Sequence, residues 1–305
     1  MLRLILNRIL GAIPTLFVII GISFFMIRMA PGGPFDQERQ LPEEIIANLN
    51  KVYHLDEPLY QQFGRYLWGI LQGDFGPSFQ YKDHTVSELI FQGFPVSLKI
   101  GGIAIVLAAI IGIFLGTIAA LRQNTRVDYL IMGFSMTGIT IPSFVMAPLL
   151  SLVIGVYLRL LPVGGWGDLK HMVLPIIALT LPQIAYIARL TRGSMIEVLR
   201  SNYIRTAKAK GLPERVILAR HALRGALLPV VSYLGPATAG IITGSVVIEK
   251  IFGIPGIGRF FVLGALNRDY TLVMGVVVFY GIIIILFNLI VDILYGILDP
   301  KVRYE

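Results

Sequence analysis

The sequence predicts an all-α membrane protein with six transmembrane helices, and three observations carry this prediction. The chain of 305 residues is 55% hydrophobic and 14% charged, whereas soluble domains carry about 25% charged residues. Its apolar residues gather in runs of about 20, the length that crosses ~30 Å of hydrocarbon as a helix. A strongly basic stretch, residues 189–224, lies between two apolar runs and is expected to stay on the cytoplasmic side.

The first apolar run, Leu10–Met29, follows Arg3 and Arg8 and is interpreted as a retained span. It is longer than the usual apolar core of a signal peptide. Arg28 stands where signal cleavage needs a small residue. Residues 1–30 are therefore expected to form an N-terminal transmembrane helix.

Residues 31–93 have ordinary polarity and are expected to form an external, periplasmic subdomain. Between Pro31 and Pro95 the chain has nine acidic and four basic residues, a net charge of −5. This balance agrees with an external position, although acidic residues orient a membrane protein weakly. Pro42 and the two glutamates after it indicate a helix start, and Asp74–Pro77 indicates a turn.

Residues 94–293 are expected to form a transmembrane domain with the five remaining spans. The second span, Val96–Leu121, leads into a short basic loop on the inside. The next apolar run, Tyr129–Leu161, is long for one span and short for two. Because the basic segments before and after it both belong inside, charge favours one long helix here, bent at Pro142 or Pro148.

The later spans are expected at Met172–Ala188, Leu228–Ile248 and Leu272–Leu294. Between the last two, Gly253–Asn267 mixes glycine, proline and arginine with apolar residues, which argues against a simple span. A re-entrant or surface-lying helix is predicted there, since irregular backbone in a membrane must be shielded. Six spans place both termini in the cytoplasm, so residues 294–305 are expected to form a cytoplasmic tail.

Residues 189–228 form a basic loop whose pattern indicates two amphipathic helices. Apolar side chains recur at helical spacing over 195–203 and 216–223, and Gly211 and Pro213 end the first helix and begin the second. Membrane orientation and lipid head groups explain such a charge by themselves. A rigid helix–turn–helix also suits docking of a cytoplasmic partner. Its basic residues are Arg189, Arg192, Arg200, Arg205, Lys208, Lys210, Arg215, Arg220 and Arg224.

The turn of this loop resembles the cytoplasmic EAA-type loop of ABC importer permeases. The family pattern is Glu-Ala-Ala, three residues, Gly, nine residues and Ile-x-Leu-Pro; here Gly211 matches the glycine and Ala207 matches an alanine. Arg205 stands in place of the glutamate. The later slot reads His221–Arg224, with the proline delayed to Pro229. These departures resemble the peptide and nickel branch of the family.

Other segments along nearly the whole chain resemble the same branch, and together they are most like its oligopeptide importers. The resemblance implies the fold of a type I ABC importer permease in the bacterial inner membrane. It also implies a heterodimer with a second permease subunit, two ATP-binding subunits and an external peptide-binding protein. These segments are Arg28–Gly32, Tyr53–Pro58, Gly73–Ser78, Arg192–Glu197 and Glu249–Gly258.

In this family the loop carries the helix that seats in the ATP-binding subunit. The resemblance therefore assigns coupling to one continuous stretch of this chain. The residues concerned are Arg205, Thr206, Ala207, Lys208, Ala209, Lys210, Gly211, Leu212 and Pro213.

The expected function is ATP-driven uptake of oligopeptides through a pathway that this chain half encloses. Peptides of varied sequence cannot be matched by fixed contacts, so small and weakly polar groups are expected to line the path. Ordinary helix packing in lipid uses the same residue types. The candidates in the fifth span are Thr238, Gly240, Thr243, Gly244 and Ser245.

The sequence gives no sign of catalysis or of a cofactor. It lacks the Gly-x-x-x-x-Gly-Lys-Ser/Thr motif that cradles phosphates, so ATP hydrolysis is expected on partner subunits. It has no cysteine, and its four histidines lack metal-ligand spacing, so no metal is expected. The net charge of +8 lies in loops beside spans, which indicates lipid head groups and not nucleic acid.

Two alternatives stay open at this point. Dipeptide and nickel importer permeases share most of the same motifs, so the cargo is less closely defined than the family. An ion-coupled secondary carrier is a different class, but Asp292 is the only charge well inside an apolar run, which argues against a proton path. A membrane-bound hydrolase would need a placed nucleophile and base, which the sequence does not indicate.

Overall fold

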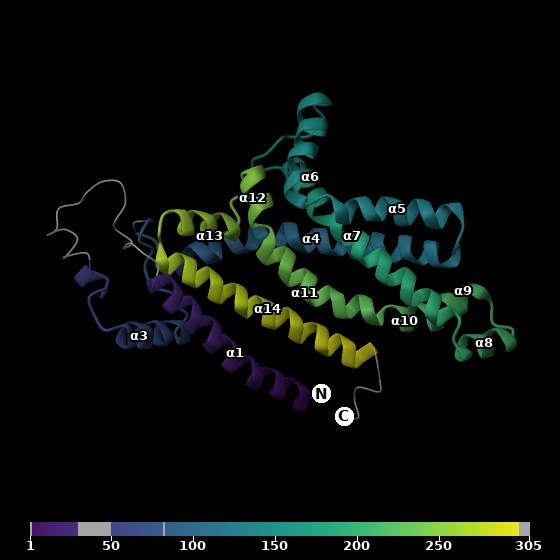
Figure 1. The fold of residues 1–305 in the computed structure, drawn as a ribbon, viewed down its shortest axis with the longest axis horizontal. Helices are drawn as coiled ribbons and strands as arrows, with labels where there is room; N and C mark the ends of the chain where they lie inside the picture. The colour runs from purple at the N-terminus through teal and green to yellow at the C-terminus, as the bar shows by residue number, and fades with distance from the viewer. Residues whose placement is uncertain (1, 30–49, 82, 299–305) are drawn as a thin grey trace. The chain divides into compact units, whose positions relative to one another are not determined.

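The computed structural model describes residues 2–29, 50–81 and 83–298, and these residues are almost entirely helical (Figure 1). Within the described ranges the one extended pairing is a bridge between Pro77 and Thr85. The elements are α1 (Leu2–Met29), α3 (Leu59–Leu71), α4 (Val86–Leu121), α5 (Arg126–Thr140), α6 (Ser143–Leu150), the π-helical segment η1 (Ser151–Tyr157), α7 (Leu169–Leu199), α8 (Asn202–Ala209), α9 (Glu214–Val216), the π-helical segment η2 (Ile217–Ala222), α10 (Leu223–Ala226), α11 (Leu228–Gly244), α12 (Val246–Phe252), α13 (Ile257–Leu266) and α14 (Tyr270–Leu298).

The chain divides into two compact units. Unit 1 contains Leu98–Ile254 together with the chain ends, up to Leu6 and from Ile284. Unit 2 contains Asn7–Ser97 and Pro255–Ile283. The long helices α4 and α14 therefore contribute residues to both units.

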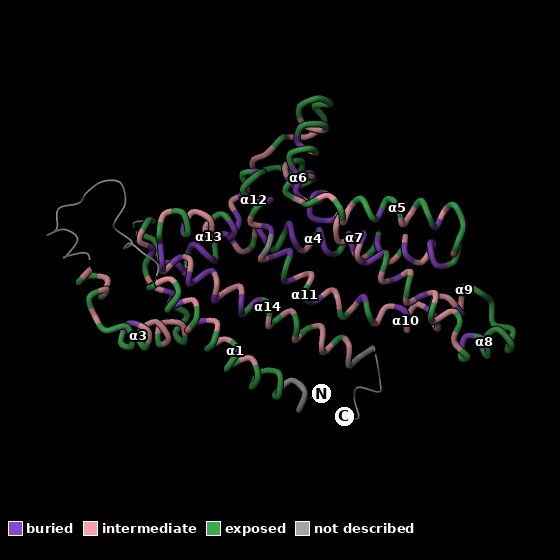
Figure 2. Tube along the Cα trace, viewed as in Figure 1, coloured by how far each residue is buried: buried purple, intermediate pink, exposed green. Residues whose placement is uncertain are grey.

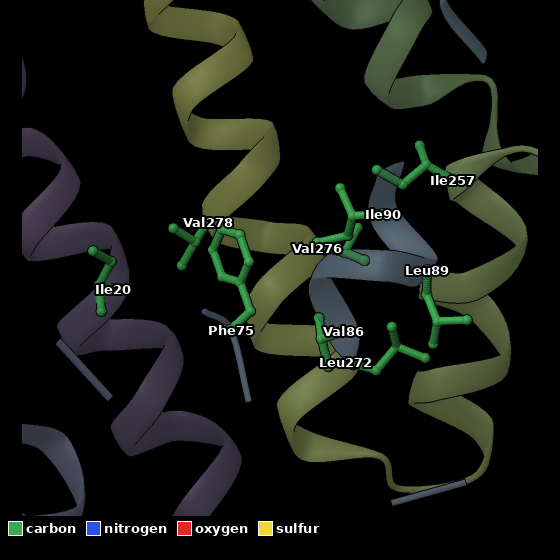
Figure 3. Close-up of a cluster of buried hydrophobic side chains, with 9 residues drawn as sticks. All are labelled: Ile20, Phe75, Val86, Leu89, Ile90, Ile257, Leu272, Val276 and Val278. Carbon is green, nitrogen blue, oxygen red and sulfur yellow. The ribbon is translucent and has the colours of Figure 1, made fainter. Parts of the chain in front are cut away.

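The core of unit 2 joins α1, α4, α13 and α14 around Phe75, which lies just ahead of α4 (Figure 3). α3 packs on α1 through aromatic rings, with the centroids of Phe24 and Phe63 5.2 Å apart. The buried hydroxyl of Ser97 accepts the N–H of Ile257 at 2.9 Å, which satisfies a free donor at the start of α13. The buried members are Ile20, Phe75, Val86, Leu89, Ile90, Ile257, Leu272, Val276 and Val278.

α7 is the central helix of unit 1 and packs against α5, α6, α10, α11 and α12. Small residues allow this close packing. It matters because lipid provides no hydrophobic driving force between helices, so van der Waals contact has to hold them together. A Cβ added at Gly116 of α4 would lie 2.5 Å from the carbonyl oxygen of Ala188. The backbones of α4 and α7 therefore approach as closely as a glycine permits.

Among the residues that the structure describes, four helices are each long and apolar enough to cross a membrane: Leu6–Met29, Val86–Leu121, Leu169–Leu199 and Tyr270–Tyr295. Two bent helix pairs pass the same test when each pair is taken together. Counting each pair as one span gives the six spans that the sequence predicts.

The bend predicted in Tyr129–Leu161 is found at Pro142, and it is sharper than a kink. α5 and the helix that begins at Ser143 meet at 100°. Pro142 has no N–H for the bond that would extend α5, and the residue before it has the extended conformation that a following proline favours (φ −89°, ψ 113°). Pro148 lies inside α6 without breaking it. The stretch is thus two helices at a steep angle.

Several helices are longer than the apolar runs that predicted them. α4 begins at Val86, ten residues before the predicted span start at Val96, and continues through Pro95. Hydropathy marks only the part of a helix that suits lipid, whereas amphipathic turns extend the helix beyond it. In contrast, the predicted span Leu228–Ile248 is too long, because α11 ends at Gly244 and a second helix, α12, follows.

The turn predicted at Asp74–Pro77 is present, with the Gly76 N–H donating to Asp74 Oδ1 at 2.8 Å. Gly253–Asn267 contains α13, a helix of 10 residues. The predicted helix start at Pro42 and the tail residues 299–305 lie outside the described residues.

Candidate functional site

The basic loop folds into a short helix, a tight turn and a second helical segment, all within unit 1. α8 begins after Ser201 and ends at Ala209. Gly211 follows with φ +72°, and its N–H donates to the carbonyl of Lys208 at 2.9 Å. Glycine adopts this left-handed conformation without the strain of a side chain. Pro213 then stands at the start of the next helix. The prediction that Gly211 ends the first helix and Pro213 begins the second is thus confirmed.

The first predicted helix of this loop is wrong in one respect, because it is not continuous across 195–203. α7 ends at Leu199, and α8 begins at Asn202. Ser201 lies between them, and both its N–H and its hydroxyl donate to the carbonyl of Val198, at 3.0 and 2.6 Å. A serine that bonds its local backbone in this way competes with the helix. Apolar periodicity continues across the break and therefore conceals it.

α8 is fixed to unit 1 by one buried face (Figure 2). Ile204 is fully buried, and Ala207 is 7% exposed. Among the predicted coupling residues, Ala207 therefore holds the helix in place and presents no outer surface. A larger side chain there would push α8 away from its support, because closely packed interiors have little free volume. The cluster is Ala120, Met195, Ile204, Ala207, Ile217, Ala222 and Ala226.

The remaining coupling candidates face outward. Within the described ranges, no carboxylate lies within ion-pair distance of Arg205, Lys208 or Lys210. Leu212 adds an apolar side chain that is 37% exposed. Three unpaired cations beside an apolar tip form a compact surface that a partner with carboxylates can match. The exposed members are Arg205, Thr206, Lys208, Ala209, Lys210, Gly211, Leu212 and Pro213. We call them the coupling surface.

An ion pair secures α7, the helix that leads into this surface. The Arg192 guanidinium of α7 donates to both oxygens of Asp128 at the start of α5, at 2.6 and 2.7 Å. The Asn124 N–H donates to the same carboxylate at 2.9 Å. The side chain of Asp128 is 1% exposed and that of Arg192 27%. Such a two-pronged pair fixes geometry as well as energy. Sequence patterns did not predict this pair, although a lone acid near the start of an apolar helix is a usable signal.

A second polar cluster joins α7 and α11 and was also missed. The Tyr233 hydroxyl donates to Gln183 Oε1 at 2.6 Å. The rings of Tyr233 and Tyr186 lie 5.8 Å apart between centroids, and the Arg189 guanidinium lies 5.3 Å from the Tyr186 ring. Polar groups within spans are costly unless they pair or serve a pathway. Here the Tyr–Gln bond ties the two helices together.

The five pathway candidates of the fifth span differ in their surroundings. The hydroxyls of Thr238 and Thr243 donate to carbonyls four residues earlier in α11, at 2.6 and 2.8 Å. Ser245 is buried, and its hydroxyl donates to Glu249 Oε1 at 2.6 Å. Gly240 is exposed, and Gly244 ends α11. Their role as a path lining stays a prediction.

Unit 2 contains a buried carboxylate that joins distant segments. Asp269 is fully buried just before α14. Its Oδ2 accepts the Ser78 hydroxyl at 2.5 Å and the N–H groups of Phe79 and Gln80 at 3.1 and 3.2 Å. Its Oδ1 accepts the N–H of Leu272 at 3.1 Å. The segment before α4 is thus tied to the first turn of the last helix. We call this arrangement the Asp269 clasp.

No group of three or more His, Asp or Glu side chains that could hold a metal ion occurs among the residues that the structure describes. Asp292, the one charge noted deep in an apolar run, has an interaction partner within the chain.

Comparison with known proteins places the chain in a family. The family described as "Binding-protein-dependent transport system inner membrane component" matches residues 112–304, and its N-terminal counterpart matches residues 1–101. The chain is 61% identical to the oligopeptide transport system permease protein OppB of Salmonella typhimurium, with 100% of both chains covered. It is 47% identical to the dipeptide transport system permease protein DppB of Bacillus subtilis, with 99% of this chain and 98% of that protein covered.

The fold is similar to a solved structure of the MetNI methionine ABC transporter in an inward facing conformation. The TM-score is 0.57 at 16% identity, and the match covers 70% of this chain and 97% of that chain. This likeness shows that the fold is that of a type I ABC importer permease. With the family matches over both parts of the sequence, it identifies the chain as a multi-pass inner-membrane protein that belongs to the binding-protein-dependent transport system permeases of ABC importers.

Proposed function

We propose that this chain is one of two permease subunits of an ATP-driven importer that takes up oligopeptides. The observation that carries the proposal is the identity of 61% to an oligopeptide permease over the full length of both chains. A path for peptides is shared between two permeases, so this chain supplies half of it.

The coupling surface is the proposed contact with an ATP-binding subunit. Its support is the geometry of α8 and the turn at Gly211, which leaves three cations outward and anchors the helix by Ile204 and Ala207. Closure of the ATP-binding subunits would move α8 and the end of α7 that leads into it, and the Asp128–Arg192 pair would pass that motion from α7 to α5. Packed elements transmit displacement because close-packed interiors resist compression.

The same proposal fixes the orientation and the partners. The basic loop and both termini lie in the cytoplasm, because basic loops are retained there. The segment before α4 then lies outside, where an external peptide-binding protein delivers cargo. ATP is hydrolysed on the two ATP-binding subunits, since this sequence has no phosphate-binding loop. The division into residues 1–30, 31–93, 94–293 and 294–305 stays a prediction.

The first experiment is purification of the tagged chain in mild detergent, followed by an ATPase assay and reconstitution into liposomes. We expect a second permease and ATP-binding subunits to co-purify, and labelled peptides to enter liposomes only when ATP is supplied. Uptake by the chain alone, driven by an ion gradient, would contradict the proposal.

Cargo length is tested in the same liposomes. Because a relative at 47% identity is a dipeptide permease, peptides of two to about six residues should be compared in competition. Preference for peptides longer than two residues supports the oligopeptide assignment. Preference for dipeptides would move the assignment to that neighbouring cargo class.

The coupling surface is tested by reversing its charge. The double variant Lys208→Glu, Lys210→Glu is expected to weaken binding of the ATP-binding subunits by at least about 10-fold, because like charges across an interface cost more than 1.4 kcal/mol. Lys51→Glu is the matched control, since Lys51 is exposed in unit 2. Equal binding by both variants would contradict this role.

A further inference from the structure

Unit 2 contains a pocket that neither the coupling surface nor the predicted path uses. Its volume is about 330 Å³, close to the lower end for ligand sites. Its walls come from the end of α1, from α3, from the turn before α4 and from the start of α14. The residues that matter for its chemistry are Arg28, Gln62, Arg65, Tyr66 and Asp74.

Three of these residues have a buried polar atom without a hydrogen-bond partner in the described chain: Arg28 Nε, Gln62 Oε1 and the Tyr66 hydroxyl. Buried polar atoms are normally paired, and an unpaired one costs about 1–3 kcal/mol. These three atoms belong to residues around one cavity but are closed to solvent in this structure, so an occupant would supply their partners only after neighbouring side chains move aside.

The orientation of Gln62 is fixed by its other bonds. Its amide nitrogen donates to the carbonyls of Leu55 and Glu57, at 3.1 and 2.7 Å. The amide oxygen is therefore left as an acceptor without a donor. Burial raises the pKa of the Tyr66 phenol, so that this group stays protonated and is available as a donor. The residues around the pocket thus carry one acceptor and two kinds of donor.

Of the two arginines that line the pocket, Arg65 has an ion-pair partner and Arg28 has none in the described ranges. Arg65 is bound to Glu57 at 2.9 Å, and His54 contacts the same carboxylate at 2.8 Å. Arg28 instead lies over the rings of Phe24 and Tyr270, 5.5 and 5.9 Å from their centroids. No carboxylate in the described ranges lies within ion-pair distance of Arg28.

Asp74 also lines the pocket, and its Oδ1 already accepts the N–H of Gly76. An anionic ligand placed beside Asp74 would be repelled. The favourable place for a negative charge is therefore the side formed by Arg28 and Tyr66. A guanidinium with a nearby hydroxyl is a suitable binder of a carboxylate.

We propose that this pocket binds the C-terminal residue of a peptide, with the carboxylate toward Arg28 and Tyr66 and the last amide N–H toward Gln62. The inference rests on the proposed function, because it takes the cargo to be peptides that arrive on the side of unit 2. A carrier of varied peptides can recognise only what all peptides share. The carboxyl end is such a feature, and a small pocket fits one end and excludes the rest.

The test measures binding of tri-alanine carrying a dye on its N-terminus, against the same peptide with a C-terminal amide. The assembled transporter is used in detergent without ATP and without the external protein, and binding is followed by fluorescence anisotropy. We expect the free acid to bind at least about 10-fold more tightly than the amide, the ratio for one lost bond to a charged group. Equal dissociation constants would overturn the proposal.

Two variants and a control locate the effect. Tyr66→Phe removes the hydroxyl and keeps the ring, and Arg28→Lys keeps the charge but loses the planar donor fork. Each is expected to reduce the preference for the free acid and to leave binding of the amide unchanged. Lys51→Gln, which removes a charge from unit 2 outside the pocket lining, should keep the preference. A preference that survives both pocket variants would overturn the assignment.

A second arm separates peptide from lipid. The measurement is repeated in nanodiscs with and without an anionic phospholipid. If anionic lipid abolishes the preference for the free acid, a lipid phosphate occupies the pocket and the peptide assignment fails. ATP-driven uptake by the unmodified transporter is measured in parallel. Uptake without any acid preference contradicts only this inference, whereas no uptake contradicts the proposed function itself.

Discussion

Two buried carboxylates, Asp128 in unit 1 and Asp269 in unit 2, are satisfied by different means. In unit 1, Asp128 is neutralised by Arg192 through two bonds of 2.6 and 2.7 Å. In unit 2, Asp269 has no cationic partner among the described residues, and backbone N–H groups and hydroxyls satisfy it instead. A charge pair orients two helices, whereas a ring of donors ties loop backbone to a helix end.

The unpaired charges of the two units differ as well. The coupling surface of unit 1 carries three exposed cations without an ion pair in the described ranges, Arg205, Lys208 and Lys210. In unit 2 the corresponding cation is Arg28, which is partly buried at the edge of a pocket. An exposed cluster suits a protein surface, and a recessed cation suits a small group. Satisfied charges hold each unit together, whereas these unsatisfied charges are the places where we propose that a partner and a ligand bind.

The largest expected effect comes from removing the cation of the unit 1 pair. Arg192→Gln leaves the buried carboxylate of Asp128 without compensation, which should destabilise the folded protein by about 3–5 kcal/mol. The measurement is the thermal unfolding midpoint in detergent. The double variant Arg192→Gln, Asp128→Asn should recover much of the loss, because no buried charge remains. If the double variant is no better than the single one, Asp128 is not held by charge.

The next effect tests the Asp269 clasp. Asp269→Asn should lower the free energy of unfolding by about 2–3 kcal/mol. The amide NH₂ would replace an accepting oxygen, so that a donor would face the donors that now bind Oδ2. Unfolding midpoint and protease sensitivity of the segment before α4 report the change. Asp74→Asn is the matched control, since this exposed acid accepts a single backbone N–H, at 2.8 Å. Similar losses for both variants would contradict the special role of Asp269.

A smaller effect concerns the turn of the coupling surface. Gly211→Ala should destabilise the turn by about 1–2 kcal/mol, because a side chain strains the backbone at φ +72°. The space around Gly211 is open, so no steric clash adds to this strain. Gly211→Asn should cost less, since asparagine tolerates this conformation. Affinity for the ATP-binding subunit is the readout. Loss of affinity in the alanine variant with recovery in asparagine would show that turn geometry, and not side-chain bulk, sets the coupling surface.

The smallest expected effect is a pH dependence in unit 2. The hydrogen bond from Arg65 holds the pKa of the Glu57 carboxyl below its ordinary value. The folded pKa is thus lower than the unfolded one, so the stabilisation is complete above the ordinary carboxyl value of about 4.3 and is lost as pH falls through the folded value. Unfolding midpoints of the wild type and Glu57→Gln should therefore converge in acid. Parallel curves down to pH 3 would contradict this.

Much of the fold could be predicted from periodicity and charge. Apolar runs located the spans, and the Gly211 and Pro213 punctuation located the turn of the basic loop. The bend in the third span was assigned to Pro142 or Pro148, and only the backbone geometry distinguished them. The break at Ser201 was missed because it depends on a local side-chain bond that apolar spacing does not record.

The functional residues show the same division between what local sequence predicts and what only the tertiary structure shows. The sequence alone determined the membrane class and the basic loop and predicted its coupling residues, because hydropathy, charge and a short motif are properties of neighbours in the chain. Only the tertiary structure decided that Ala207 faces inward, that Asp128 meets Arg192, and that Arg28 and Tyr66 share a pocket. These pairings join residues that are far apart along the chain. Their energies depend on distance and burial, which the order of residues does not contain.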